Sequence, residues 1–599
     1  MTTAKKPVPS KGIVPYVPAE ADEFQQMAAS YQKGEIKDAE FTPWRLRRGI
    51  YGQRQEDRQM VRVKIPGGIL TADALDILGE VAEKYVPLRK GHITTRENIQ
   101  YHHVLLEHAP DLMRLMGQAG LTTREACGNT VRNVISCPLG GVCRNEVFDL
   151  TPYMVAYTRR FVRHPVTQNM PRKWKTSFSP CASDCANAPM HDLGFIAVVK
   201  DENGVRRKGF KMLVGGGTSI MPKYAQTLYE FVPVEDFLRV SEAALRVFNQ
   251  ADELRKNKMM ARVKVLIHKI GIDKYRELVE EELKKPWARE GDFDPTPLME
   301  DLVAHEEAGA LAKQTNGHGG APPVDLEFGV WRRSNAIAQR QAGFYAVSVK
   351  VTRGDLSPEQ FHGLADLVRR HAGGQVRLTP EQNLTIRWVR EQRLYDIWKA
   401  LKALNLAEPD AQDINDVCSC PGTDSCKLGI TSSMGLALAL RESFKTYNGL
   451  ADDPLVKKLH IKMSGCPNGC GRHHIANIGF QGAMVKGPDG QQVPAFEPFL
   501  GGAYENGETR YGQRLPGVKL PSKRVPEALK AFLEFYKENR RENEEFNAFY
   551  DRVGPQPFVD IASRFRDVGP LNKETIGLYM DWGKTVLYKV ERGEGECAV

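Results

Sequence analysis

The segment MVRVKIPGGILTADALDIL (60–78) recurs as YAVSVKVTRGDLSPEQFHGL (345–364), and this repeat decides the fold. Each copy opens with apolar residues at every second position, which predicts a strand. Each copy then turns at a glycine and continues with apolar residues at helical spacing, so a helix follows the strand. Thr71 and Ser357 are the predicted N-caps of the two helices, and Ser357 forms a capping-box pattern with Gln360.

Two later pairs of segments keep nearly the same separation along the chain. ITTRENIQ (93–100) matches LTPEQNLT (378–385), and the Cys-x3-Cys pair that ends at Cys185 matches the pair that ends at Cys470. The separation slips only once, from 286 to 285 residues. We therefore infer an internal duplication. It predicts a pseudo-two-fold protein in which a ligand shared by the two halves lies at their interface.

The composition is that of an ordinary globular protein, with 599 residues, 41% hydrophobic and 26% charged. No apolar run approaches the roughly 20 residues of a membrane-spanning helix, and the N-terminus lacks the apolar core of a secretory signal. We therefore expect a cytoplasmic protein with no membrane partner. The net charge of +9 suits an acidic partner or an anionic substrate. No nucleic-acid-binding motif is present, so we expect no nucleic acid partner.

The eleven cysteines fall mostly in tight local groups, which favours metal ligands over a disulfide framework. In the second half, Cys420-x5-Cys426 is followed by Cys466-x3-Cys470. Four thiolates in two close pairs can hold one 4Fe–4S cluster. The gaps differ from the two-residue gaps of zinc ribbons, although a structural zinc site remains the alternative. The surrounding glycines and prolines predict tight turns that aim backbone N–H groups at the sulfur atoms.

Further segments carry a resemblance to a known family. In chain order they are MVRVKIPGG, TTRENIQYHH, NTVRNV, PRKWKTS, GFKMLVGGG, RKNKMMARVKVLIHKIG and LTPEQNL. Together with the cysteine pairs they resemble the sirohaem-containing sulfite and nitrite reductases, over residues 45–280 and 340–500. The resemblance implies sirohaem and one 4Fe–4S cluster, which Cys420, Cys426, Cys466 and Cys470 would hold. It also implies that the thiolate of Cys470 bridges the cluster to the sirohaem iron.

The resemblance implies an α+β fold with an internally duplicated architecture. Two ferredoxin-like half-domains pair with each other, and two larger α/β domains carry the sirohaem and the cluster. The expected ranges are an N-terminal arm (1–52), ferredoxin-like repeats (53–122 and 338–402), a first sirohaem and substrate domain (123–285), a linker (286–337), a cluster-binding domain (403–560) and a C-terminal tail (561–599).

The same resemblance places four basic side chains above the distal face of the haem iron. By motif these are Arg62, Arg132, Lys173 and Lys175. Cleavage of an S–O or N–O bond needs protons and stabilisation of negative charge on the leaving oxygen, which these side chains supply. Lys173 and Lys175 are two residues apart, so on a strand both point to one face.

A further set of residues is expected to bind the sirohaem carboxylates or to let backbone approach the macrocycle. It comprises His92, Thr94, Thr95, Arg96, Gln100, Gly215, Gly216, Gly217, Arg262, Gln382 and Asn383. His92 departs from the family, which often has arginine there.

Two cysteine features stay open at this point. Cys137-x5-Cys143 and Cys181-x3-Cys185 repeat nearly the same spacing in the first half, which favours either a second cluster or a vestige of the duplicated ancestor. Tyr51 and Cys127 have the layout of a Tyr–Cys pair that some relatives link covalently near the substrate, and an unlinked packing pair is the alternative.

The Lys-x-Lys pattern at Lys175 favours sulfite, because a second ammonium suits a doubly charged anion. We therefore predict six-electron reduction of sulfite to sulfide, with reduction of nitrite to ammonia as the alternative. A non-catalytic iron–sulfur or redox carrier is a remote alternative. No flavin- or NAD(P)-binding unit is visible, so a separate ferredoxin or similar acidic protein is the expected electron donor of a monomeric enzyme.

Overall fold

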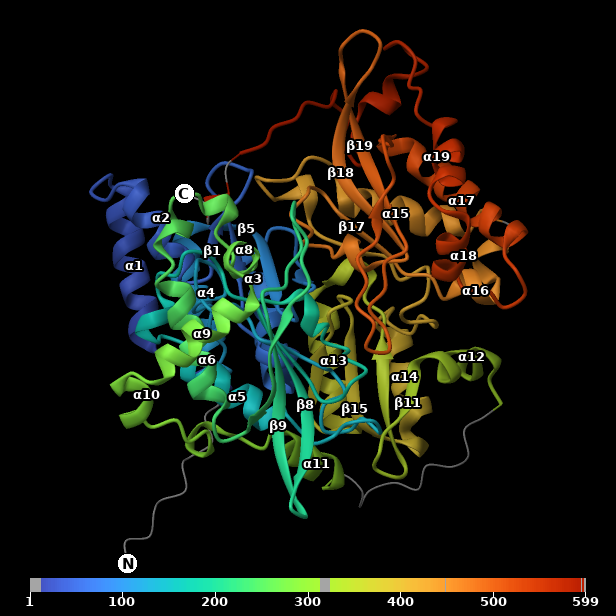
Figure 1. Ribbon diagram of the computed structural model, residues 1–599. Helices are drawn as coiled ribbons and strands as arrows, with labels where there is room; N and C mark the ends of the chain where they lie inside the picture. The colour runs from blue at the N-terminus through green and yellow to red at the C-terminus, as the bar shows by residue number, and fades with distance from the viewer. Residues whose placement is uncertain (1–11, 313–323, 448, 594, 597–599) are drawn as a thin grey trace, which may run out of the picture.

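The computed structural model describes residues 12–312, 324–447, 449–593 and 595–596. The Gly- and Pro-rich stretch of the predicted linker (313–323) and Cys597 lie outside the described residues. The described chain is an α+β protein with four sheets, as predicted. Helices cover the sheets on several sides (Figure 1).

Two of the sheets have the same five-stranded pattern. The first runs β1 (Ile50–Gly52), β2 (Arg58–Arg62), β5 (Ile99–Leu105), β4 (Gly91–Ile93) and β13 (Asp355–Leu356). The second runs β11 (Ala336–Ala338), β12 (Phe344–Val349), β15 (Leu384–Arg390), β14 (Gln375–Leu378) and β3 (Ile69–Thr71). The strand that closes each sheet comes from the other half of the chain, so the two repeats exchange their edge strands.

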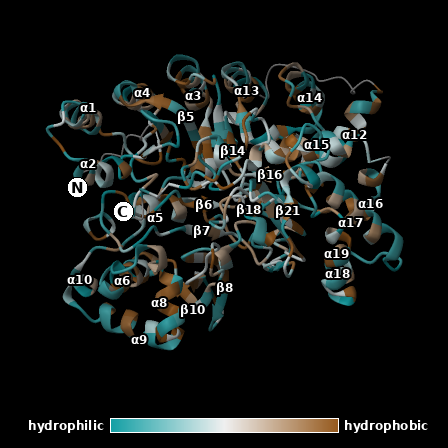
Figure 2. Cartoon of the chain, turned by 90° about the horizontal axis from the view of Figure 1, so that it is seen from above, coloured by the Kyte–Doolittle hydropathy of each residue, from teal (hydrophilic) through white to brown (hydrophobic). Residues whose placement is uncertain are grey.

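Helices α3 (Ala72–Tyr85) and α13 (Pro358–His371) follow the exchanged strands and lie side by side (Figure 2). Their N-caps are those that the sequence predicts. The Thr71 hydroxyl accepts from the amide of Ala74 at 3.2 Å, and both bonds of the Ser357 capping box are present. Five further helices lie beside this pair or flank it. They are α1 (Pro18–Gln32), α2 (Asp38–Leu46), α4 (Ala109–Gln118), α12 (Leu326–Asn335) and α14 (Leu394–Ala403).

The other two sheets also repeat one pattern. One contains β6 (Ile135–Ser136), β7 (Thr176–Ser179), β8 (Leu193–Glu202), β9 (Val205–Val214) and β10 (Gln226–Pro233). The other contains β16 (Cys418–Ser419), β17 (Ile461–Ser464), β18 (Ile478–Lys486), β19 (Gln492–Leu500), β20 (Gln513–Arg514) and β21 (Leu520–Pro521). In each sheet the first three strands are parallel and the fourth is antiparallel. The duplication therefore extends through both large units.

Each large unit has its own set of helices. The first unit has α5 (Thr151–Phe161), α6 (Phe237–Asn249), α7 (Asp252–Arg255), α8 (Val263–Ile270) and α9 (Ile272–Leu283). The second has α15 (Ser433–Phe444), α16 (Pro454–Lys457), α17 (Val525–Asn539), α18 (Phe546–Val553) and α19 (Gln556–Ser563). Within the described residues, none of the helices combines the length and the apolar composition that crossing a bilayer requires.

One apolar core joins the two five-stranded sheets. It contains the period-two residues of both repeats, including Val61 and Val63 from one copy and Val347 and Val349 from the other, all fully buried. Each large unit has a separate core of its own. Because one core serves both repeats, the halves are held together at the same place where the exchanged strands pair.

The segment between the halves contributes buried charge. It contains α10 (Pro286–Glu290) and α11 (Leu302–Leu311), and α11 carries Glu306 into the interior. The Glu306 carboxylate pairs with the fully buried Arg387 and lies 3.7 Å from Arg377. The linker thus supplies the counter-ion for two buried arginines of the second half.

The C-terminal residues return to the N-terminal arm. The Glu596 carboxylate accepts from Arg45 at 3.0 Å and from the amide of Gly52 at 2.9 Å. The predicted division at residue 560 falls inside α19. The domain ranges therefore stay a proposal.

Glu306→Gln should destabilise the protein by about 3–5 kcal/mol, because it removes the negative charge that two buried guanidinium groups share. Thermal or denaturant unfolding measures the loss. Glu307→Gln, one residue along the same helix and only partly buried, is the matched control. An equal effect of the two substitutions would contradict the role given to the Glu306 charge.

Candidate active site

The four second-half cysteines follow two adjacent parallel strands. Cys420 comes directly after β16, and Cys466 comes two residues after β17. The two strands pair in parallel through Ser419 and Met463. Because parallel neighbours end at the same edge of a sheet, both cysteine loops leave the sheet on one side.

The thiols of this group lie in one neighbourhood. The amide of Gly465 donates to the Cys420 sulfur at 3.3 Å. Burial and then the Cys470 thiolate raise the pKa of Cys420 to about 12, and the same two causes raise the pKa of Cys426 and Cys466. In the described part of the chain, no three His, Cys, Asp or Glu side chains converge on one point as ligands of a single ion. The ligands of a four-iron cluster need no such point, since each binds a different iron.

Cationic side chains crowd the space beside Cys470. Burial, Arg262, Lys173 and Arg96 lower the pKa of Lys175 far below its usual value, and the Cys470 thiolate opposes that shift. Thr95 fixes the backbone here, since its hydroxyl donates to the Cys470 carbonyl at 2.8 Å. The structure therefore brings the predicted lysines to the cysteine that is expected to bridge.

Lys173 and Lys175 flank a buried tryptophan. Trp174 is fully buried, and its amide donates to the Thr130 carbonyl at 3.0 Å. The Trp174 carbonyl accepts from the amide of Arg132 at 2.9 Å. Because side chains alternate along an extended segment, burial of Trp174 puts both lysines on the opposite face.

The two predicted arginines share one acceptor. Arg62 and Arg132 both donate to the Ala126 carbonyl, at 3.4 and 3.3 Å. Arg62 also lies opposite Gln100 across β2 and β5, and the Gln100 amide oxygen accepts from the Arg62 Nε at 3.0 Å in the orientation that satisfies both groups. Because the Trp174 backbone also pairs with Arg132, the segments that carry the four predicted substrate residues are neighbours.

Arg96 and Arg262 lie behind the lysines. Asp192 binds Arg262 through two bonds of 2.7 Å and also accepts from the Lys175 amide. Arg96 contacts His191 and the Asn133 carbonyl. Burial and then the nearby Arg472 lower the pKa of Arg96 to about 9. The positive charge in this region therefore exceeds what the described acidic side chains balance.

Three cations of this region were missed by the sequence analysis. Lys64 donates to the Val131 carbonyl at 3.1 Å, and burial lowers its pKa to about 8. Burial and then Arg262 lower the pKa of Lys264 to about 7. Arg472 donates to the Thr95 carbonyl at 2.7 Å. Lys64 and Lys264 lie in the motifs that supplied Arg62 and Arg262, each two residues further along the chain. For Lys64, two-residue spacing was the available signal, whereas Lys264 lies in the first turn of α8, where that spacing predicts no shared face.

These side chains test the fit of sirohaem. A buried, closely packed set of cations with lowered pKa values is costly without a compensating anion. The residues present therefore fit the cofactor pair that the sequence predicts.

The three predicted glycines have different structural reasons. Gly215 has a φ of 91°, and a Cβ on Gly216 would lie 2.2 Å from the Pro189 carbonyl oxygen. A Cβ on Gly217 would lie 3.0 Å from the Arg262 guanidinium. Only Gly217 of the three thus borders the cationic group through a contact of this kind. Glycine at position 215 is explained by its positive φ, and glycine at position 216 by the close approach of the Pro189 carbonyl.

Four other predicted cofactor residues have their polar groups engaged within the protein. His92 contacts Asp355 at 3.0 Å and Gln382 at 3.2 Å through its two ring nitrogens. The Gln382 side-chain oxygen Oε1 accepts from the Ser419 amide at 2.8 Å. The Asn383 side-chain oxygen Oδ1 accepts from the amide of Val351, and the Thr94 hydroxyl donates to the Asn98 side chain. These contacts tie strands and turns together, and a role toward sirohaem stays a prediction.

Tyr51 and Cys127 lie in one small apolar cluster with Leu46 and Met60. The Cys127 thiol donates to the Gly49 carbonyl at 3.7 Å. The two side chains are thus near each other, as their layout in the sequence predicts. A covalent link between them stays a prediction.

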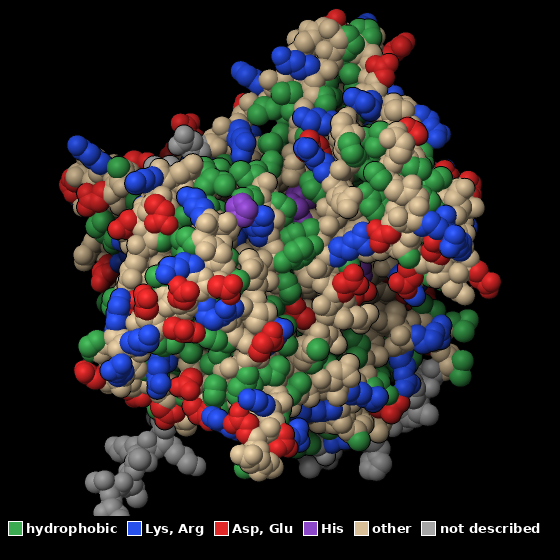
Figure 3. Space-filling model, in the orientation of Figure 1, with side chains coloured by type: hydrophobic (Ala, Val, Ile, Leu, Met, Phe, Trp, Pro, Cys, Tyr) green, Lys and Arg blue, Asp and Glu red, His purple; other side chains and the backbone are tan. Residues whose placement is uncertain are grey.

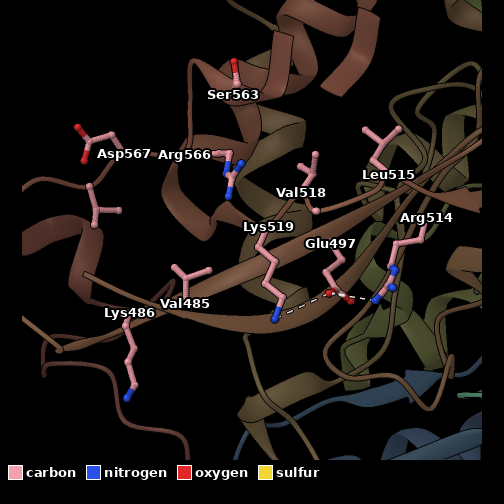
Figure 4. Close-up of a pocket in the computed structure, with 12 residues that line it drawn as sticks. Val485, Lys486, Glu497, Arg514, Leu515, Val518, Lys519, Ser563, Arg566 and Asp567 are labelled. Carbon is pink, nitrogen blue, oxygen red and sulfur yellow. Dashed lines mark hydrogen bonds and ion pairs between the residues drawn. The ribbon is translucent and has the colours of Figure 1, made fainter. Parts of the chain in front are cut away.

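A surface pocket of about 680 Å³ lies away from these residues, at the end of the second large unit. Figure 4 shows Lys519 and Arg514 directed toward Glu497, with nitrogen–oxygen distances of 3.9 and 3.5 Å. Its charges are thus partly paired. Nothing in its lining matches the chemistry around Cys470.

The chain matches two family models in both halves. The nitrite and sulphite reductase 4Fe-4S domain matches residues 127–287 and 410–565, and the nitrite/sulfite reductase ferredoxin-like half domain matches residues 51–119 and 337–404. The chain therefore belongs to the nitrite and sulfite reductase family, as predicted. Membership confirms an oxidoreductase that uses sirohaem and a 4Fe–4S cluster.

Individual relatives carry both substrate names. The chain is 31% identical to the sulfite reductase (ferredoxin) of Mycobacterium tuberculosis H37Rv, with 81% of each chain covered. It is 28% identical to the ferredoxin–nitrite reductase of Synechococcus elongatus, covering 74% of this chain and 80% of the relative. The solved structure of the Mycobacterium tuberculosis NirA protein matches with a TM-score of 0.74 at 26% identity, covering 91% of this chain and 98% of that one.

The cofactor-free protein should become more stable as the pH rises from about 7 to 9. Lys264 and Lys64 lose their protons in the folded protein near pH 7 and 8, whereas in the unfolded chain they keep them until about 10.4. The unfolded state then binds more protons, so the free energy of unfolding increases with pH. Below pH 7 this contribution is absent.

Lys264→Met should flatten this dependence, and unfolding curves at several pH values measure the slope. Lys269→Met, an exposed position on the same helix, should leave the slope unchanged. A slope that Lys264→Met does not alter would show that this ammonium is not the titrating group.

Proposed function

We propose that the protein reduces sulfite to sulfide with six electrons, at a sirohaem that the Cys470 thiolate joins to a 4Fe–4S cluster. The observation that carries the proposal is that Lys175, with Lys173 beside it, lies near Cys470. Arg132 pairs through its backbone with the Trp174 between these lysines, and it shares the Ala126 carbonyl with Arg62. The sirohaem and its attached cluster supply single-electron transfer to the bound anion. The remaining steps fall to side chains of this chain.

The cluster is held by the two cysteine loops that leave β16 and β17. Cys420, Cys426, Cys466 and Cys470 would be its ligands, and the Cys470 thiolate would also bind the sirohaem iron. The Gly465 amide that donates to Cys420 is the kind of contact that lowers the cost of a charged cluster. The exposed position of Cys470 leaves its sulfur open to a second metal.

The cations bind and orient the anionic substrate. Arg62 and Arg132 offer guanidinium N–H groups to the anion, and their shared acceptor, the Ala126 carbonyl, holds the two groups close together. Lys173 and Lys175 offer ammonium groups that stabilise the leaving oxygen and donate its protons. Burial and the neighbouring cations lower the pKa of Lys175, which makes its ammonium a stronger proton donor.

Sulfite is preferred to nitrite for two reasons. The second ammonium of the Lys-x-Lys pair balances the second charge of sulfite, and relatives named sulfite reductase stand at 28–31% identity. Relatives named nitrite reductase stand at 27–28%, and reduction of nitrite to ammonia by the same residues is the alternative. A non-catalytic carrier would have no use for four cations at an open iron face.

The electron donor is proposed to be a ferredoxin, as the names of the relatives indicate for those proteins. A net charge of +9 favours an acidic donor. Lys, Arg, Asp and Glu side chains are interspersed over the face in Figure 3, so that face has no single large basic patch. The ten described cysteines are all free thiols, which suits the reducing cytoplasm, and we propose a monomer there.

Lys175→Asn should lower kcat/KM for sulfite by about 10²–10³-fold and for nitrite by less than about tenfold, because it removes one charge from the anion site. Parallel assays of both anions with a reduced viologen dye measure the two ratios. Lys200→Asn, an exposed lysine on β8, is the control and should change neither. An unchanged ratio of the two kcat/KM values would refute the use of Lys175 as the discriminating residue.

A further inference from the structure

The first half contains a second group of four cysteines in the same place in the fold. Cys137 comes directly after β6, and Cys181 comes two residues after β7. These strands pair in parallel through Ser136 and Phe178, as β16 and β17 do through their equivalents. The Cys-x5-Cys and Cys-x3-Cys loops of both halves therefore leave corresponding edges of corresponding sheets.

The first-half Cys-x3-Cys loop also keeps the backbone conformation of the second-half loop. Asp184 and Asn187 have φ values of 48° and 52°. Their equivalents 285 positions later, Gly469 and Arg472, have φ values of 67° and 62°. Because a left-handed conformation is uncommon away from glycine, its retention at Asp184 and Asn187 needs support. The Asp184 carboxylate gives it by accepting from the Ala188 amide at 2.9 Å.

The four thiols meet in two contacts. The thiol of Cys137 hydrogen-bonds that of Cys185, and the thiol of Cys143 hydrogen-bonds that of Cys181. Cys137 and Cys181 are 4% exposed, whereas Cys143 is partly exposed and Cys185 is exposed. The group is thus shielded on one side and reachable from the surface on the other.

Backbone amides point at these sulfurs in the manner of the second half. The amides of Leu139 and Asn145 donate to the cysteines two residues before them. Cys181 accepts from the amides of Ser183 and Asp184. In the second half, the amides of Leu428 and Asn468 occupy the same two-residue positions after Cys426 and Cys466. Such donors stabilise thiolates bound to a charged cluster.

We propose that Cys137, Cys143, Cys181 and Cys185 hold a second 4Fe–4S cluster. Neither the family match nor the proposed sulfite chemistry assigns these residues. The described structure contains no disulfide among them, so all four sulfurs are available as ligands.

The second cluster is not joined to a second tetrapyrrole. The positions equivalent to Arg62, Arg96 and Lys175 are Ser348, Glu381 and His460. Glu381 lies 3.9 Å from Lys462, and His460 pairs with Glu505 at 2.7 Å. The surroundings of the first-half cysteine loops therefore contain paired charges at the positions where cations surround Cys470. A polyanionic macrocycle has no matching site there.

The full-length protein, purified anaerobically with sirohaem bound, tests this site. Metal analysis should give about nine irons per sirohaem, since each cluster adds four irons to the haem iron. Mössbauer spectra should resolve two clusters, of which one is coupled to the haem. About five irons in the wild-type protein, one zinc at these thiols, or disulfides mapped by mass spectrometry would overturn the proposal.

The double variant Cys143→Ser/Cys181→Ser should lose about four irons and keep both the sirohaem absorption and the coupled cluster. Cys127→Ser, a buried thiol outside both groups, should keep about nine. If the double variant fails to fold, the wild-type iron count still decides. Sulfite turnover is scored separately, so inactivity with about nine irons would contradict the proposed reaction and leave the second cluster standing.

Discussion

The structure depends on an excess of buried positive charge beside Cys470. Side chains from β2, from the turn between β4 and β5, from the segment before β7 and from the start of α8 all contribute to it. Asp192 balances one guanidinium, while burial first and neighbouring cations second lower the pKa values of Arg96, Lys64 and Lys264. A polyanionic ligand turns this electrostatic cost into binding energy.

The duplication explains why the charge gathers at one place only. Two equivalent corners exist, each with a pair of cysteine loops at the edge of a sheet. The region beside Cys470 contains arginines and lysines, whereas the equivalent region beside the first-half cysteines contains Glu381 and other paired charges. The halves still meet at equivalent positions, since Arg472 donates to the Asn187 side chain at 3.0 Å. The duplicated, pseudo-two-fold structure thus contains two cysteine regions that are equivalent in fold but different in charge.

Local patterns in the sequence predicted the repeated elements and the gathering of the site. Period-two and helical spacing predicted the strand and the helix of each repeat. The family motifs predicted that Lys173 and Lys175 lie near Cys470. The exchange of β3 and β13 could not be predicted, because pairing between strands far apart in the chain leaves no local periodicity. The burial of Glu306 was equally hidden, since a lone acid on a helix reads as a surface residue.

Within the site, the sequence analysis was least informative where one residue type serves several purposes. A glycine-rich turn suggested approach to a macrocycle, yet Gly216 is explained by the Pro189 carbonyl. His92 and Gln382 lie in family motifs, yet each contacts the other across the two halves. Lys64 was overlooked beside Arg62, because only the fold reveals which lysines are buried.

The central claim is that the sulfur of Cys470 is shared by the cluster and the sirohaem iron. Mössbauer and electron paramagnetic resonance spectra of the anaerobic, sirohaem-loaded protein test it most directly. The account predicts magnetic coupling between haem and cluster in the wild-type protein, its loss in Cys470→Ser and its retention in Cys185→Ser. Coupling that survives in Cys470→Ser, or a fully metallated protein without sirohaem absorption, would contradict it.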